Sequence, residues 1–156
     1  MKTFNLYGDE WDGEETRPGW TSKDGWVGAR LGAELLGGSV YELAAGDRLW
    51  PYHAHHANEE WLIVLRGTPT LRTPDGEQVL AEGDVAVFVR GRAGAHQVRN
   101  DTTAPVRVLM MSSMVTPDIV EYLDSGKVSA SAIDGTRIIH GPPGPILDYW
   151  DGEDEG

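Results

Sequence analysis

The chain has 156 residues, of which 40% are hydrophobic and 24% charged, as expected for one globular domain with a hydrophobic core. The absence of cysteine excludes disulfides, thiolate metal ligands and cysteine nucleophiles, and a formal net charge of −12 argues against binding to nucleic acid. No segment approaches the ~20 apolar residues of a membrane span and the start lacks a signal-peptide core, so we expect a cytoplasmic protein with no membrane partner.

Residues 1–28 show no regular period, and we expect an irregular arm or short edge strands there. From about residue 29 to 111, short apolar or alternating segments recur between Gly, Pro and Asp turns. This pattern predicts an antiparallel sheet that is closed or sandwiched, without βαβ units. The predicted strands cover residues 39–43, 61–65, 70–73, 77–80, 85–89, 96–100 and 106–111.

After Met111 the pattern changes. Thr116 resembles a helix N-cap, followed by Pro117 and an acidic residue, Asp118, in the first turn. We therefore predict a short helix over about 117–124 that ends before Gly126.

Four of the five histidines lie between residues 53 and 96. His53 and His55 are two residues apart in a segment we expect to be extended, so both side chains point to one face and His56 to the other. Glu60 heads the next strand, and His96 begins a later one. If these strands are neighbours, three imidazoles and one carboxylate converge inside the barrel.

This set of side chains suits one divalent transition metal ion per chain, which we expect to be iron, manganese, zinc or nickel. Four protein ligands in an octahedral shell leave two positions for water, substrate or dioxygen. Open positions are typical of catalytic rather than sealed structural metal sites.

The histidine segment resembles the first motif of the cupin superfamily of small β-barrels. That motif reads Gly, five residues, His-x-His, three or four residues, Glu, six residues, Gly. Here Gly46 is followed by six residues, His53, Ala54 and His55, then four residues, Glu60, six residues and Gly67. The one departure is an extra residue before the histidines.

A second motif of the same family reads Gly, five residues, Pro-x-Gly, two residues, His, three residues, Asn. Here Gly83 is followed by five residues, Val89, Arg90 and Gly91, then four residues, His96, three residues and Asn100. Val89 replaces the proline, and two extra residues lengthen the loop before His96. No ligand is lost in either motif.

The resemblance implies an all-β fold, the cupin double-stranded β-helix or jelly-roll barrel, with our predicted short C-terminal helix appended. One cupin domain would span residues 1–156, with an N-terminal arm (1–28), a barrel core (about 29–111) and a C-terminal helix and tail (112–156). The resemblance to bacterial single-domain cupins also implies a metal held by His53, His55, Glu60 and His96, and a homodimer.

Several assignments stay open on the sequence alone. Glu59 competes with Glu60 as the carboxylate, although strand face and spacing to Gly67 favour Glu60. His56 and His140 are expected to be structural or surface residues, and Asn100 to bond turn backbone. Aromatic residues near the histidines could line a substrate pocket or belong to the core or a dimer surface: Tyr41, Trp50, Tyr52 and Trp61. No catalytic acid or base can be assigned.

Three functions fit this sequence. The first is a metal-dependent enzyme acting on a small polar metabolite, as a dioxygenase, isomerase, decarboxylase or lyase. The second is a barrel that binds a sugar or small acid without turnover. The third keeps the metal but makes it structural, so that chelation would unfold the chain.

Overall fold

The computed structural model describes residues 1–141 and residue 144, so the end of the predicted C-terminal tail lies outside the described residues. It contains a short helix, α1 (Val27–Leu31), and a single 3₁₀ turn, η1 (Arg92–Gly94). Its strands are β1 (Gly13–Glu15), β2 (Ser22–Gly25), β3 (Gly37–Leu43), β4 (Arg48–His55), β5 (Glu60–Arg66), β6 (Thr70–Thr73), β7 (Gly76–Val79), β8 (Val85–Phe88), β9 (His96–Arg99), β10 (Val106–Ser112), β11 (Asp118–Tyr122), β12 (Lys127–Ser131) and β13 (Arg137–His140).

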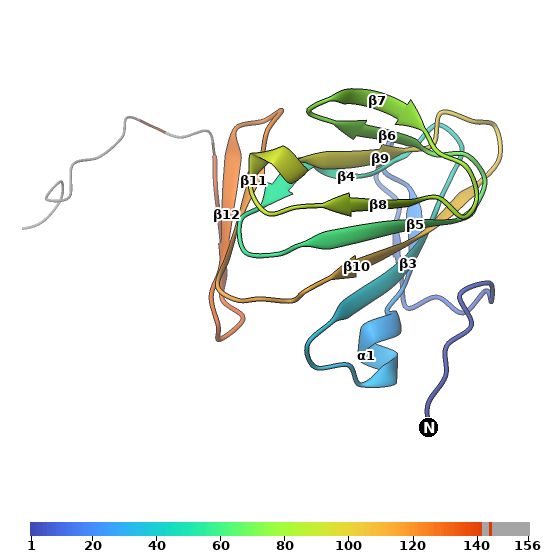
Figure 1. Ribbon diagram of the computed structural model, residues 1–156, viewed down its shortest axis with the longest axis horizontal. Coiled ribbons are helices and arrows are strands. Elements are labelled where there is room, and N and C mark those ends of the chain that lie inside the picture. The colour runs from blue at the N-terminus through green and yellow to red at the C-terminus, as the bar shows by residue number, and fades with distance from the viewer. Residues whose placement is uncertain (142–143, 145–156) are drawn as a thin grey trace, which may run out of the picture.

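These strands form two antiparallel sheets that pack against each other (Figure 1). One has the order β1-β2-β3-β10-β5-β8 and the other the order β13-β12-β11-β4-β9-β6-β7. Apolar side chains from both sheets meet in one core: Leu43, Leu49, Leu62, Val64, Leu71, Leu80, Phe88, Val98, Val106 and Val108. The sheets stay separate, so the all-β prediction is confirmed but the barrel is not closed by hydrogen bonds.

The predicted strands between residues 39 and 111 correspond to β3 and β5–β10, with ends that agree within about two residues. In β5 the alternation is visible in the exposure of the side chains, because Leu62 and Val64 are buried while Trp61 is 44% exposed. Period-two patterning therefore located both the strands and their buried faces.

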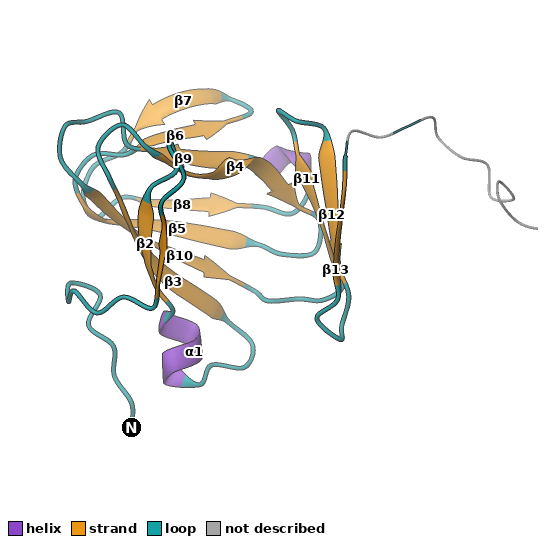
Figure 2. Ribbon diagram, turned by 180° about the vertical axis from the view of Figure 1, so that it is seen from behind, coloured by secondary structure: helices purple, strands orange, loops and turns teal. Residues whose placement is uncertain are grey.

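The N-terminal segment forms short edge strands rather than an irregular arm. β2 pairs with β3, with Ser22 opposite Leu43 and Gly25 opposite Val40, and β1 pairs with β2 in turn. The segment thereby extends the first sheet (Figure 2).

The predicted C-terminal helix over 117–124 is wrong. Residues Asp118–Tyr122 form strand β11, which pairs with β4 on one side and β12 on the other. Ile119 and Val120 are β-branched and fit a strand better than a helix, and pairing with β4 outweighs the helix-start signal of Thr116 and Pro117. The β11–β13 strands stand at one end of the two sheets (Figure 2).

Among the described residues, no helix combines the length and the apolar character that crossing a membrane requires.

Candidate metal centre

Strand β4 brings His53 and His55 to the interior. The register with β9 places His53 opposite His96 and Leu49 opposite Val98, so three residues of β4 lie across from the single residue 97. This bulge contains Trp50, whose φ of 56° is rare for a residue with a side chain. The bulge lies in the stretch where the first motif carries its extra residue, so that residue does not displace the histidines.

Glu60 rather than Glu59 faces the histidines. The Oε2 atom of Glu60 lies 3.3 Å from Nε2 of His96 and 3.5 Å from Nε2 of His55. Glu59 points to the outer face, where its carboxylate accepts a hydrogen bond from the indole of Trp61 at 3.1 Å. Of the two candidate carboxylates, Glu60 is therefore the one that lies beside the histidines.

The long loop before His96 is tightly held. Gly91 donates a backbone hydrogen bond to the carbonyl of His55 at 2.7 Å, which ties the loop to β4. Gly94 packs so closely on Val89 that a Cβ atom there would lie 1.8 Å from the Val89 carbonyl oxygen. The ring of Phe88 stacks on His96 with centroids 3.7 Å apart. The two extra residues of the second motif are thus accommodated by the three-residue turn η1, which leaves His96 beside His53.

All three histidines are fixed through Nδ1. His53 Nδ1 lies 2.8 Å from the carbonyl oxygen of Pro51, and His96 Nδ1 lies 3.0 Å from that of Gly94. His55 Nδ1 lies 2.5 Å from a carboxylate oxygen of Asp118. Because a carbonyl or carboxylate oxygen only accepts, each Nδ1 carries the proton in the neutral ring, and each Nε2 presents a lone pair.

The nitrogen and oxygen atoms of the cluster are arranged as ligands of a cation. One nitrogen or oxygen from each of His53, Glu60 and His96 lies within 4.8 Å of the others, which is close enough for all three to hold one ion. In the described part of the chain, His96 Nε2 is the one buried side-chain nitrogen or oxygen without a hydrogen-bond partner. A metal ion bound between an imidazole lone pair and a carboxylate satisfies both groups, so this donor set fits a divalent metal.

His55 lies at the edge of this group. His55 is not one of the three residues whose nitrogen or oxygen atoms all lie within 4.8 Å of one another, although its Nε2 atom is near Glu60. The structure therefore brings His53, Glu60 and His96 together and places His55 beside them. His56 lies on the outside, where its Nε2 contacts Glu121 at 2.7 Å, and His140 is the exposed last residue of β13 rather than part of a loop.

Burial and mutual charge control the ionisation of the cluster. Burial, together with the neighbouring His96 and His55, lowers the pKa of His53 to about 4. Burial alone would raise the pKa of Glu60, but the surrounding imidazoles outweigh it and the pKa is lowered. At neutral pH the site therefore holds a neutral His53 and an ionised Glu60, which is the state that binds a metal.

The pKa of His53 makes the stability of the metal-free protein depend on pH. An unfolded histidine titrates near 6.5, so between pH 6.5 and 5 the unfolded chain takes up a proton that the fold excludes. We expect the free energy of unfolding to fall by about 1.5 kcal/mol over this range, measured by urea denaturation in chelator. A His53→Gln variant should lose this dependence and His140→Gln should keep it, and equal slopes for the three proteins would refute the assignment.

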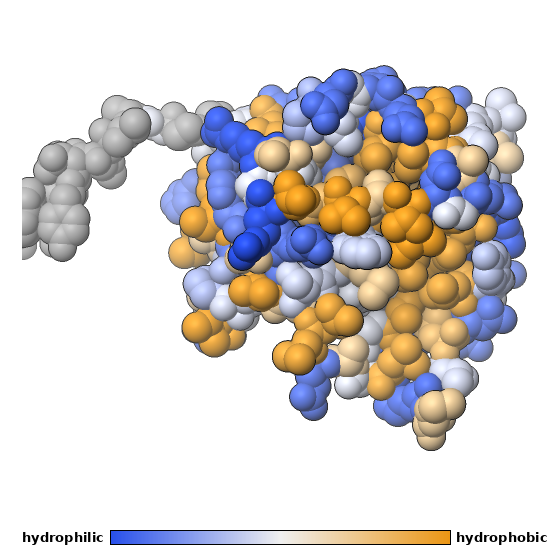
Figure 3. Space-filling model, viewed as in Figure 1, coloured by the Kyte–Doolittle hydropathy of each residue, from blue (hydrophilic) through white to orange (hydrophobic). Residues whose placement is uncertain are grey.

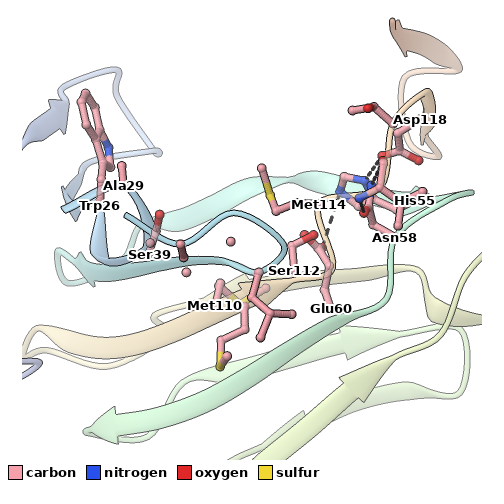
Figure 4. A pocket seen from close by; sticks show the side chains of 18 of the residues that line it. Trp26, Ala29, Ser39, His55, Asn58, Glu60, Met110, Ser112, Met114 and Asp118 are labelled. Atoms are coloured by element: carbon pink, nitrogen blue, oxygen red, sulfur yellow. Dashed lines mark hydrogen bonds and ion pairs between the residues drawn. The ribbon is translucent and has the colours of Figure 1, made fainter. Parts of the chain in front are cut away.

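Two cavities meet at the cluster. A smaller one of about 250 Å³ contains His53, His96 and Glu60 and is walled by Tyr41 and Trp50. A larger one of about 650 Å³ reaches His55 and Glu60 from the other side (Figure 4). Figure 4 shows its methionine wall, Met110 and Met114, with Trp26 and Ala29 across the opening.

The other two candidate aromatics do not line either cavity. Tyr52 is buried beneath the guanidinium of Arg72, which lies 3.9 Å from its ring centroid. Trp61 is on the outer face of its sheet. Of the four aromatic residues for which a pocket position was left open, Tyr41 and Trp50 therefore line a cavity at the cluster.

Asp118, Tyr122 and Arg137 reach the site although the sequence interpretation did not select them. Asp118 and Tyr122 lie on one face of β11, with Tyr122 paired to His53 in the register with β4. The alternation of Asp118, Val120 and Tyr122 could have indicated a strand with these residues on one face. The apparent helix start at Thr116 and Pro117 favoured a helix instead. Arg137 comes from β13 and lines the smaller cavity.

Comparison with known proteins agrees with this architecture. The family model of the cupin domain matches residues 39–112. A proposed sugar phosphate isomerase from Acidithiobacillus ferrooxidans is 27% identical, with 80% of this chain and 78% of that chain covered and a TM-score of 0.73. No match is found among functionally curated proteins.

Two further solved structures share the fold at lower identity. A cupin-superfamily sugar phosphate isomerase from Silicibacter pomeroyi is 23% identical, with 80% of this chain and 81% of that chain covered and a TM-score of 0.74. A polyketide cyclase from Streptomyces resistomycificus is 21% identical, with 76% and 83% covered and a TM-score of 0.61. One fold thus serves proteins with different activities.

Proposed function

Because the chain belongs to the cupin superfamily, we propose that it is a metal-dependent enzyme acting on a small polar metabolite. One divalent ion, of iron, manganese, zinc or nickel, would be held by His53, His55, Glu60 and His96. The observation that carries this proposal is the buried Nε2 of His96, which has no hydrogen-bond partner among the described residues and faces Glu60. A cation between them satisfies both groups.

The bound ion would supply Lewis-acid polarisation of a substrate oxygen, or dioxygen chemistry if it is iron. The chain itself contributes a shielded cavity and a phenol. Burial raises the pKa of Tyr41, so its hydroxyl stays protonated at neutral pH and can donate a hydrogen bond to a ligand in either cavity. No described lining residue has the paired geometry of a covalent nucleophile and its base.

The reaction to test first is the interconversion of aldose and ketose sugar phosphates. It is supported by the 27% identity to the proposed isomerase from Acidithiobacillus ferrooxidans across most of both chains. Protein stripped with chelator and reloaded with Fe²⁺, Mn²⁺, Zn²⁺ or Ni²⁺ should turn over at least one sugar phosphate, and Glu60→Gln should abolish turnover while leaving the melting temperature nearly unchanged. Binding of sugar phosphates without product would favour the non-catalytic binding function, and full turnover in chelator would reject the metal-dependent one.

Asp118 should position His55 for metal binding. Its carboxylate holds the proton on His55 Nδ1, whereas an asparagine can turn its NH₂ group toward the ring and stabilise the tautomer that blocks Nε2. We expect Asp118→Asn to weaken metal affinity about 10–100-fold, measured by competition with a chromogenic chelator.

The control for this variant is Glu121→Gln. Glu121 lies on the same strand and holds His56, which is outside the proposed ligand set, through an equivalent contact. The Glu121→Gln variant should leave metal affinity unchanged. Equal losses in the two variants would show a general effect of β11 rather than control of the His55 tautomer.

We further propose that the protein is a homodimer formed through the outer face of β5 and β8. Trp61 lies opposite Val87 in the register, and both are nearly half exposed, as are Val85 and Val89 (Figure 3). Burial of such an apolar face stabilises association. Light scattering should show a dimer that Val87→Lys converts to a monomer, whereas Val79→Lys on β7 should not. A monomeric parent protein at micromolar concentration would contradict this proposal.

A further inference from the structure

The smaller cavity is lined by a cationic side chain, that of Arg137, which is not among the proposed metal ligands. Its ionised lining groups are Glu60 and Arg137, because the remaining residues are neutral aromatic, apolar and imidazole side chains. Arg137 lies on β13, far along the chain from His53 and His96, and it lines the same cavity as they do.

Arg137 is held by hydroxyl groups. Its Nη2 donates to the Tyr122 hydroxyl at 2.7 Å and its Nε donates to the Ser129 hydroxyl at 2.9 Å. Tyr122 in turn stacks beside His53, with ring centroids 6.3 Å apart. The guanidinium is therefore fixed in orientation, next to the cluster, by groups that carry no negative charge.

Several other arginines in the described part of the chain have a different environment, whereas Arg17, Arg48 and Arg90 also have no ion pair there. The guanidinium groups of several pair directly with carboxylates at 2.6–2.9 Å: Arg30, Arg72, Arg92, Arg99 and Arg107. Within the described residues, no carboxylate lies within ion-pair distance of Arg137. Its charge is thus available to a ligand, and its planar donors match the geometry of an oxyanion.

From these contacts we infer that Arg137 is a specificity-determining residue that binds an anionic oxygen group, phosphate or carboxylate, of the substrate. This inference rests on the proposed function and names the class of its substrate. A divalent ion and Arg137 outweigh the single charge of Glu60, so the filled cavity favours an anion. The substrate would place its reacting oxygens toward the histidines and its anionic group toward the Arg137–Tyr122 pair.

The test is an NMR titration of the ¹⁵N-labelled full chain, first metal-free and then loaded with Zn²⁺, with inorganic phosphate and separately with malonate. We expect saturable shifts at Arg137 and Tyr122 in both forms. Arg137→Gln should weaken binding about tenfold or more, and Arg137→Lys should weaken it less because the charge is kept. Arg17→Gln, which removes an exposed arginine outside this cavity, should bind like the parent protein.

The outcomes separate the two proposals. Tighter binding of phosphate indicates a phosphorylated substrate, and tighter binding of malonate indicates a carboxylate substrate; both support an anion site at Arg137. Unchanged anion affinity in a folded Arg137→Gln variant overturns the inference, whether or not metal binds. Loss of anion binding in that variant together with a failure to take up any metal supports the anion site and rejects the metal-dependent function.

Discussion

Replacing Arg107 by methionine is expected to lower the free energy of unfolding by about 3–5 kcal/mol. The Arg107 side chain is 1% exposed and donates to Glu42 at 2.6 Å and Asp9 at 2.9 Å. It also donates to the carbonyl of Gly8 at 2.8 Å and lies over the ring of Trp11. Methionine keeps the volume but leaves Glu42 largely buried without its cation and detaches the N-terminal segment from β10.

The matched control is Arg66→Met. Arg66 lies 3.9 Å from the same Glu42 carboxylate, but its side chain is 51% exposed. Exposed pairs of this kind contribute at most about 1 kcal/mol, so urea denaturation should separate the two variants clearly. Equal losses would mean that burial of Arg107 does not determine the strength of this interaction.

The His96→Ala variant is expected to lose metal affinity by more than about 100-fold and to remain folded. Removal of a group that only orients a metal ligand lowers metal affinity about 10–100-fold, so removal of the ligand itself should lower it more. The fold should survive because the apolar core of the two sheets is built from side chains other than His96. Isothermal titration with Zn²⁺ and a thermal melt in chelator measure the two effects.

His56→Ala is the control for metal affinity, because His56 lies on the outer face and contacts Glu121. It should bind metal like the parent protein. If chelation unfolds the parent protein, the metal is structural rather than catalytic. If His96→Ala melts far below the parent when both are in chelator, the His96 side chain itself stabilises the fold.

The strands and the buried faces were predictable because their signals are local. Alternation and the turn at Pro74–Gly76 define β6 and β7, and alternation separates His55 from His56. Asn100 was expected to bond turn backbone, and its side-chain amide donates to the carbonyls of Leu43, Ala44 and Ala104.

The rest of the site depends on pairing between distant segments. Asp118 meets His55, and Arg137 meets Tyr122, only because β11 pairs with β4 and the β12–β13 hairpin follows it. Short-range signals at Thr116–Asp118 indicated a helix instead, since a helix start and a strand start can share the same residues. Non-local strand pairing decides between them, and it is not encoded in any one segment.

The two motif departures show how the fold absorbs inserted residues. The extra residue before His53 enters a bulge at Trp50, and the two extra residues before His96 are accommodated by the turn η1. Both insertions lie outside the paired positions, so His53 and His96 still face each other across the sheet. The spacing of a motif can therefore vary while the arrangement of its side chains is kept.

The most direct test of the metal centre is a crystal structure of protein grown in metal-replete medium, with data collected at the absorption edges of iron, manganese, nickel and zinc. We expect one anomalous peak per chain, from an ion bonded to Nε2 of His53, His55 and His96 and to the Glu60 carboxylate. An ion at another place in the chain, or an empty cluster in protein soaked with each metal, would contradict it.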